Sequence, residues 1–149
     1  MSHIRNAAAG DISRIAEILV FTKRMQYRPI FQNDAVSFGE IQVLPTAQEY
    51  IDDPQRLAPI WVYDDGIIKG LIHIENGEIC ELYVDPFFHG EGVGSQLIEF
   101  AIHNHNADRL WVLEKNAHAI RFYEKHGFSR SGERKLVPDT PEYVMLMTR

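Results

Sequence analysis

Three glycines at alternate positions, Gly90, Gly92 and Gly94, separate an apolar, β-prone stretch from a stretch with helical spacing. Glycine permits positive φ angles and lets a ligand approach the backbone closely, because no Cβ stands in the way. The helix start that follows adds unpaired N–H groups and the positive end of the helix dipole. This combination predicts an anion site suited to a pyrophosphate, although a structural turn explains the glycines alone equally well. Neither the G-x-G-x-x-G of a Rossmann loop nor the Gly-Lys-Ser/Thr of a Walker loop is present.

Five residues of a later segment recur at the spacing Asn-x-x-Ala-x-x-x-Tyr-x-x-x-Gly-Phe: Asn116, Ala119, Tyr123, Gly127 and Phe128. This segment, together with the glycine loop, resembles the GNAT superfamily of N-acetyltransferases, whose loop reads Arg/Gln-x-x-Gly-x-Gly/Ala. Gly92 and Gly94 match that loop, whereas His89 stands where the family usually has Arg or Gln. We expect cofactor affinity to be kept, because backbone N–H groups supply most of the binding. The resemblance covers residues 58 to 149 well and the N-terminal third only by element order.

The resemblance implies acetyl-coenzyme A as the cosubstrate, with no metal. The pantetheine arm would lie along the strand Glu78 to Val84, where this strand and the one at Arg109 to Leu113 splay apart. Backbone groups of Leu82 and Val84 would hold the arm, and the N–H of Leu82 or Tyr83 would polarise the thioester carbonyl. The remaining cofactor-binding residues implied by the resemblance are His89, Gly90, Glu91, Gly92, Val93, Gly94 and Ser95 around the pyrophosphate, with Asn116, Ala119 and Tyr123.

The implied reaction is direct attack of a primary amine on the thioester, followed by loss of the coenzyme A thiolate. Tyr123 holds the family position of the acid that protonates the thiolate, and a tyrosine packed in the core is the alternative. The amine, whose pKa lies near ~10.4, must also lose a proton. Candidate bases are Glu81 and Glu78, with Glu81 favoured and a base acting through water favoured over direct contact. Strand periodicity predicts that these two side chains lie on opposite faces.

The irregular, aromatic-rich segment from Met25 to Phe38 is expected to build the acceptor site. Its candidates for acceptor contacts are Tyr27, Arg28, Phe31 and Asp34, and ordinary surface or lid packing is the alternative. The acceptor is left open between a small-molecule amine and a peptide amine. A noncatalytic acyl-CoA-binding sensor, which would keep the loop without needing Tyr123, is the alternative function.

The other nucleophilic and imidazole side chains have simpler interpretations. Cys80 is expected to be a small buried residue rather than an acyl carrier. His103 and His105 point apart on a helix, so they do not predict a metal site. His118 and His126 are expected on exposed helix surface, and His73, which alternates with isoleucines on a strand, is a candidate to face the cleft.

The elements that would position these residues follow the order β-α-α-β-β-β-α-β-α-β-β. The first helix is expected to fade before Pro29. A strand–helix–strand crossover near the middle implies one parallel pairing. We therefore expect an α/β (α+β) fold with a mixed, mostly antiparallel sheet of six to seven strands and about four flanking helices. This is a GNAT-like acyl-CoA N-acyltransferase fold in a single domain, residues 1 to 149.

Composition narrows the partners and the compartment. The formal net charge of -6 and the lack of a basic stripe argue against nucleic acid binding. No apolar stretch approaches the ~20 residues that span a bilayer, and the N-terminus does not read as a signal peptide. The single cysteine fits a reducing compartment. These features predict a cytoplasmic protein with no membrane partner. They do not decide whether the protein forms a homodimer.

Overall fold

The computed structural model describes residues 2–32, 38 and 41–149. Seven strands form one sheet in the order β1-β2-β3-β4-β5-β7-β6. The strands are β1 (Ile4–Asn6), β2 (Ile60–Asp64), β3 (Ile68–Glu75), β4 (Glu78–Val84), β5 (Arg109–Leu113), β6 (Ser129–Leu136) and β7 (Tyr143–Thr148). Every pairing is antiparallel except that of β4 with β5. The expected mixed sheet with one parallel pair is confirmed.

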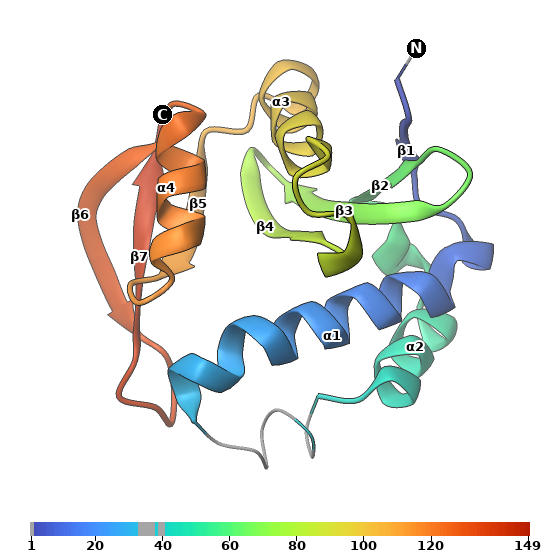
Figure 1. The fold of residues 1–149 in the computed structure, drawn as a ribbon, viewed down its shortest axis with the longest axis horizontal. Coiled ribbons are helices and arrows are strands. Elements are labelled where there is room, and N and C mark those ends of the chain that lie inside the picture. Colours follow the sequence, from blue (N-terminus) through green and yellow to red (C-terminus); the bar gives the residue numbers. More distant parts are fainter. Residues whose placement is uncertain (1, 33–37, 39–40) are drawn as a thin grey trace.

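The described residues form four α-helices, which cover both faces of the sheet (Figure 1). They are α1 (Ile12–Phe31), α2 (Val43–Asp52), α3 (Val93–His105) and α4 (Ala117–Lys125), with short 3-10 turns at Ala9–Asp11, Pro54–Leu57 and Pro86–Phe88. One hydrophobic core lies between α1, α2 and the sheet, and a second lies between α3, α4 and the opposite face. None of the described helices is both long enough and apolar enough to cross a membrane.

Helix α1 continues further than the sequence predicts. The expectation that it fades before Pro29 is wrong, because the helix runs to Phe31 with Pro29 inside it. Proline removes one backbone hydrogen bond, but here it lies in the last turn, where few bonds depend on it. Gln32 then closes the helix in the left-handed region at a φ of 51°, and its N–H donates to the carbonyl of Arg28 at 2.9 Å.

Strands β4 and β5 pair over a short distance only. Their register joins Glu78 with Arg109 and Ile79 with Leu110, and no later residues of the two strands pair. The backbone of β4 beyond Ile79 therefore has one unpaired edge, which faces the gap toward β5. The expected splaying of these two strands is observed.

A β-bulge interrupts β4 just before this gap. His73 pairs with Glu81 and Ile74 pairs with Ile79, so Cys80 is an extra residue with no partner of its own. A bulge breaks the two-residue alternation of a strand and re-aims the side chains beside it. This feature decides where the charged side chains of β4 lie.

Candidate active site

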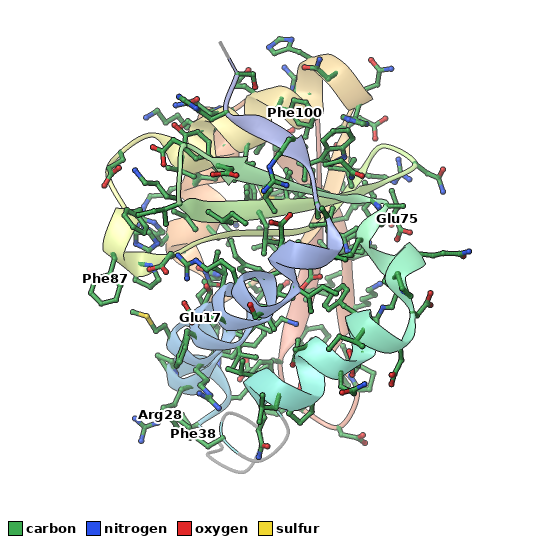
Figure 2. All side chains as sticks on the ribbon, turned by 90° about the vertical axis from the view of Figure 1, so that its right-hand side faces the viewer. Glu17, Arg28, Phe38, Glu75, Phe87 and Phe100 are labelled. Carbon is green, nitrogen blue, oxygen red and sulfur yellow. The ribbon has the colours of Figure 1, made fainter. Side chains whose placement is uncertain are left out.

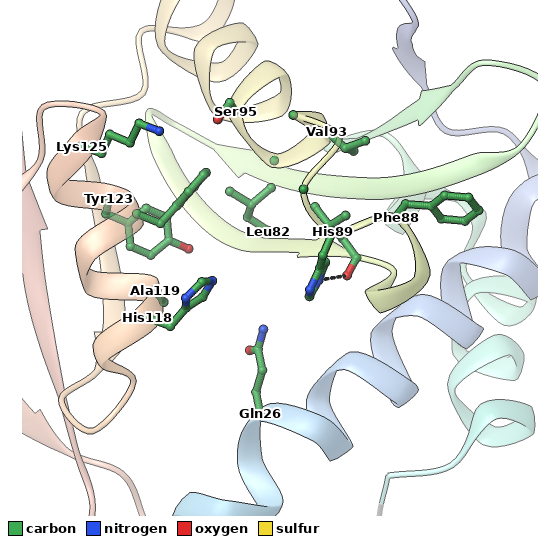
Figure 3. Close-up of a pocket in the computed structure, with 15 residues that line it drawn as sticks. Gln26, Leu82, Phe88, His89, Val93, Ser95, His118, Ala119, Tyr123 and Lys125 are labelled. Atoms are coloured by element: carbon green, nitrogen blue, oxygen red, sulfur yellow. Dashed lines mark hydrogen bonds between the residues drawn. The ribbon is translucent and has the colours of Figure 1, made fainter.

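The glycine loop borders a cavity of about 480 Å³, the outer cavity, between the end of β4, the start of α3 and one face of α4 (Figure 3). The predicted cofactor residues that line it are Leu82, Val84, His89, Gly90, Gly92, Val93, Gly94, Ser95, Ala119 and Tyr123. Lys125 also lines it, and no described lining residue is acidic. In a chain with a net charge of -6, this lining suits an anionic ligand.

The loop conformation depends on glycine at two positions. Gly90 and Gly92 have φ angles of 84° and 81°, in the region that other residues rarely adopt. A Cβ on either would meet open space, so the requirement concerns backbone conformation and not crowding within the protein. Gly92 is the N-cap of α3, and the first-turn amides of Val93, Gly94 and Ser95 have no intrahelical acceptor. The loop therefore presents N–H groups where an anion can reach them.

The His89 ring is turned toward the strand rather than into open solvent. Its Nε2 lies 3.1 Å from the carbonyl oxygen of Val84 (Figure 3). Because a carbonyl only accepts, Nε2 must carry the proton in this hydrogen bond. His89 thus connects the loop to the end of β4. This role is not predicted from the position of His89 in the loop pattern, where the family usually has Arg or Gln.

A second, smaller cavity of about 130 Å³, the inner cavity, lies in the gap between β4 and β5. Among the predicted residues, it is lined by Glu81, Leu82, Tyr83, Asn116, Ala119, Tyr123 and Tyr27. Leu82, Ala119 and Tyr123 border both cavities, so the two lie end to end along the unpaired edge of β4. The Asn116 side chain accepts a hydrogen bond from the Ala119 N–H at 3.2 Å and caps α4.

The tyrosines around the inner cavity are held in their protonated form. Burial raises the pKa of Tyr123 above its ordinary value, and burial together with the neighbouring Tyr27 raises that of Tyr83. Both phenols therefore keep their proton at neutral pH. Figure 3 shows the Tyr123 hydroxyl directed into the cavity. Tyr83 also lines the inner cavity, and its hydroxyl lies 3.2 Å from that of Tyr27 on α1.

Of the two candidate bases, Glu81 borders the inner cavity, whereas Glu78 borders neither the inner nor the outer one. Its carboxylate lies 3.5 Å from His73 Nδ1 and 3.3 Å from Lys23 Nζ. Burial acts to raise the pKa of Glu81, but the hydrogen bond from His73 and the charge of Lys23 outweigh it, so the pKa is lowered. Glu78 instead lies 4.0 Å from Arg109.

The prediction that Glu78 and Glu81 face opposite sides of β4 is wrong. The bulge at Cys80 adds one residue between them, and the negative charges of both carboxylates act on the Cys80 thiol. Cys80 is also half-buried rather than fully buried. Burial, followed by the charges of Glu78 and Glu75, raises the pKa of the thiol to about 11. A thiol that stays protonated is a poor acyl-carrying nucleophile at neutral pH.

The predicted acceptor residues are only partly brought together. Tyr27 lines the inner cavity, and the Phe31 ring packs edge-on against it with 5.6 Å between ring centroids. Arg28 is exposed and lies over the Phe38 ring at 5.5 Å, and it borders neither cavity. Asp34 lies outside the described residues. Glu91, predicted at the loop, pairs with Lys69 at 3.1 Å and does not line the cavity.

Several residues at the site have no counterpart in the sequence predictions. They are Gln26, Phe88, His118, Phe122 and Lys125, which line the outer cavity. His118, Phe122 and Lys125 lie on α4 at spacings of four and three residues, so one helix face brings them beside Tyr123. His118 is exposed as expected, at the border of the cavity.

The expectation that His126 lies on exposed surface is wrong. Its side chain is 9% exposed, with Nδ1 at 2.7 Å from Glu99 Oε1 and Nε2 at 3.3 Å from Ser95 Oγ. The imidazole therefore joins the end of α4 to the first turns of α3. Ser95 lines the outer cavity, so His126 orients one of its walls.

Comparison with known proteins gives the same family as the loop and the α4 segment. The acetyltransferase (GNAT) domain family matches residues 56–130, half of the chain. Peptidyl-lysine N-acetyltransferase YjaB of Salmonella typhimurium is 31% identical over 87 residues, 57% of this chain and 60% of that protein. An uncharacterized N-acetyltransferase of Mycobacterium tuberculosis is 35% identical over 96 residues, 58% of this chain and 61% of that protein. These matches span about 60% of the length of the curated relatives.

Solved structures agree on the fold. An N-acetyltransferase from Staphylococcus aureus Mu50 superposes with a TM-score of 0.76 at 15% identity, covering 98% of this chain and 99% of that one. The PaiA N-acetyltransferase of Thermoplasma acidophilum, solved in complex with coenzyme A, has a TM-score of 0.69 at 19% identity over the full length of both chains. These likenesses concern the fold, and the family match across the loop, the splayed strands and α4 shows that the chain belongs to the GNAT acetyltransferase family.

Proposed function

We propose that this protein transfers an acetyl group from acetyl-coenzyme A to a primary amine by direct attack. The observation that carries the proposal is the pair of cavities that meet at Tyr123. The outer cavity offers helix-start amides and no described acidic side chain, and the inner one holds a carboxylate and a protonated phenol. The anionic acetyl-coenzyme A and the reacting amine thus have separate binding sites that are connected at Tyr123.

The outer cavity has the chemistry that parts of coenzyme A require. A volume of about 480 Å³ lies within the ordinary range of ligand sites. The loop from His89 to Ser95 would hold the pyrophosphate, with Lys125 adding a positive charge at the border. The unpaired edge of β4 at Leu82 and Val84 would bind the pantetheine amides as an added strand. The solved structure of PaiA contains coenzyme A, and that of yncA from Salmonella typhimurium contains acetyl-CoA, which supports this assignment.

The thioester makes the acetyl carbonyl carbon open to attack by the amine. The protein residues stabilise the negative charge on the carbonyl oxygen and transfer the protons. The N–H of Leu82 or Tyr83 donates to the carbonyl oxygen as negative charge develops. Tyr123, which keeps its proton at neutral pH, donates it to the departing thiolate. Glu81, which its lowered pKa keeps ionised at neutral pH, is available to accept the proton of the amine, directly or through a water molecule. His73 and Lys23 hold that carboxylate in place.

The acceptor is proposed to be a lysine side chain of a peptide. The names of the relatives YjaB and YiaC, both peptidyl-lysine N-acetyltransferases, support this choice. In this chain Tyr27 and Phe31 would flank the amine where α1 meets the inner cavity. A small-molecule amine is the competing acceptor.

The test is release of free coenzyme A thiol from acetyl-CoA in the presence of a panel of lysine peptides and small amines. We expect release that depends on an amine and that is greatest with a lysine peptide. Release with small amines only would reject the peptide acceptor and keep the enzyme. Binding of acetyl-CoA without release by any amine would support the alternative, a noncatalytic acyl-CoA sensor.

A further inference from the structure

We propose that His73, Glu75 and Cys80 form a binding site for a divalent metal ion, with Zn²⁺ as the best match. The site lies beside the Asn76–Gly77 turn that joins β3 to β4, and it does not depend on the proposed function. Figure 2 labels Glu75 at this end of β3. A thiol, an imidazole and carboxylates together are the donor set that Zn²⁺ takes in proteins.

Two backbone features bring the donors together. His73 and Glu75 are alternate residues of β3, so their side chains leave the same face of the strand. The bulge makes Cys80 an extra residue of β4 and turns its thiol toward them. Because neither feature can be read as a ligand motif in the sequence, spacing alone does not predict this site.

The distances suit a tetrahedral ion. His73 Nε2 lies 3.3 Å from Glu75 Oε2, and Cys80 Sγ lies 3.9 Å from Glu75 Oε2 and 3.8 Å from Glu78 Oε2. The donor atoms of His73, Glu75 and Cys80 all lie within 4.8 Å of one another. Zn²⁺ bonds of ~2.0–2.3 Å in tetrahedral geometry place neighbouring ligand atoms roughly 3.3–3.8 Å apart. Small rotations of the side chains would therefore complete the shell.

The imidazole of His73 is already oriented as a ligand. Its Nε2 is buried and has no hydrogen-bond partner among the described residues, although it lies near Glu75. Its Nδ1 lies 3.5 Å from Glu81 Oε1. A carboxylate on the far nitrogen of a ligating histidine fixes the tautomer that offers the near nitrogen to the metal. Glu81 would supply this outer support.

Charge and access favour a cation at this point. The carboxylates of Glu75 and Glu78 lie 3.9 Å and 3.8 Å from the thiol, and that of Glu81 lies beside His73, so negative charge gathers around the donor atoms. Binding of Zn²⁺ forms a metal–sulfur bond, releases the thiol proton to solvent and changes no oxidation state. The Glu75 side chain is 57% exposed, so an ion can reach the site from solvent.

The competing interpretation is a protonated His73 that bridges two carboxylates. The hydrogen bond to Glu81 raises the pKa of His73, and this shift favours the protonated imidazole of the competing interpretation. The two differ in one measurable respect. A bridging imidazolium has no need of Cys80, whereas the metal site requires its thiolate.

The test titrates the full-length, chelator-treated protein with Co²⁺ and then displaces Co²⁺ with Zn²⁺. Since Cys80 is the only cysteine, a thiolate-to-cobalt charge-transfer band can come only from it. We expect this band at one ion per chain and its loss on adding Zn²⁺. Cys80→Ser should abolish the band, and His73→Gln and Glu75→Gln should each weaken Co²⁺ binding about tenfold or more, the scale of loss seen when metal-site partners are removed.

The matched control is His103→Gln, which removes an exposed histidine that also lies beside a carboxylate, at 2.9 Å from Glu99. It should bind Co²⁺ as wild type does. Circular dichroism confirms the fold of each variant, and the exposed position of Glu75 makes Glu75→Gln informative even if Cys80→Ser misfolds. A wild-type protein without the band, or a Glu75→Gln variant that binds Co²⁺ as tightly as His103→Gln, would overturn the proposal.

Discussion

The Tyr123 hydroxyl and the Glu81 carboxylate belong to side chains that border the same inner cavity, one from α4 and one from β4. Their environments act in opposite directions. Burial raises the pKa of Tyr123, whereas His73 and Lys23 lower that of Glu81 against the effect of burial. At neutral pH the cavity therefore holds one proton donor and one proton acceptor. The acceptor can take the proton that an ammonium group must lose before its amine attacks, and the donor can protonate the departing thiolate.

Replacing Tyr123 with phenylalanine removes the proton donor and keeps the ring. We expect turnover to fall about 100-fold, the lower end of what general acid catalysis contributes, with acetyl-CoA affinity nearly unchanged. Steady-state kinetics and calorimetry measure the two quantities. Tyr143→Phe, on β7, is the matched control and should keep full activity. An equally active Tyr123→Phe enzyme would show that the phenol is only a packing group.

Replacing Gly92 with alanine tests the loop conformation. Its φ of 81° costs an alanine roughly 1–2 kcal/mol, which corresponds to about tenfold weaker coenzyme A binding if the bound loop must keep that shape. Gly10→Ala is the control, because Gly10 has open space around it and no positive φ. If the two variants bound coenzyme A with equal affinity, the result would contradict the proposal that the loop conformation at Gly92 binds the diphosphate.

The link between His126 and Ser95 predicts an effect at a distance from the ligand. His126→Ala should release the Ser95 hydroxyl and weaken coenzyme A binding several-fold, because the first turn of α3 loses a side-chain anchor. His103→Gln removes the exposed neighbour of Glu99 and should leave affinity unchanged. Calorimetric titration of both variants checks this, and equal losses would point to Glu99 rather than to Ser95.

The ion pair of Arg5 and Asp11 predicts a pH-dependent stability. The hydrogen bond from Arg5 lowers the pKa of Asp11, whose ordinary value is 3.8. Because the pKa of Asp11 is lower in the folded state, its ionised form stabilises the fold at every pH above its ordinary pKa. This stabilisation is lost as the pH falls through the lowered, folded-state pKa. Asp11→Asn should therefore cost about 1 kcal/mol at neutral pH. The difference in unfolding free energy from wild type should narrow below pH 3.8, as urea titrations across this range can show.

Sequence reasoning located the parts of the site that depend on local backbone chemistry. Positive φ angles at Gly90 and Gly92, and the Asn116 cap of α4, follow from residue type and spacing alone. The parts that it missed depend on contacts between distant segments. The bulge at Cys80 arises from the register between β3 and β4, and the burial of His126 arises from the packing of α4 on α3.

The continuation of α1 past Pro29 has a local cause. A proline ends most helices, but Pro29 lies in the last turn of α1, where it removes one backbone hydrogen bond, and the Gln32 N–H still closes the helix by donating to the carbonyl of Arg28. As a result, Gln26 and Tyr27 are held on a regular helix beside the cavities rather than on an irregular loop.

The most direct test of the central claim compares calorimetric titrations with coenzyme A and with pantetheine, which lacks the diphosphate and the 3′-phosphoadenosine attached to it. If the loop at the start of α3 binds the diphosphate, coenzyme A should bind at least tenfold more tightly, a difference of about 1.4 kcal/mol. Equal affinities, or no heat with coenzyme A, would contradict the account.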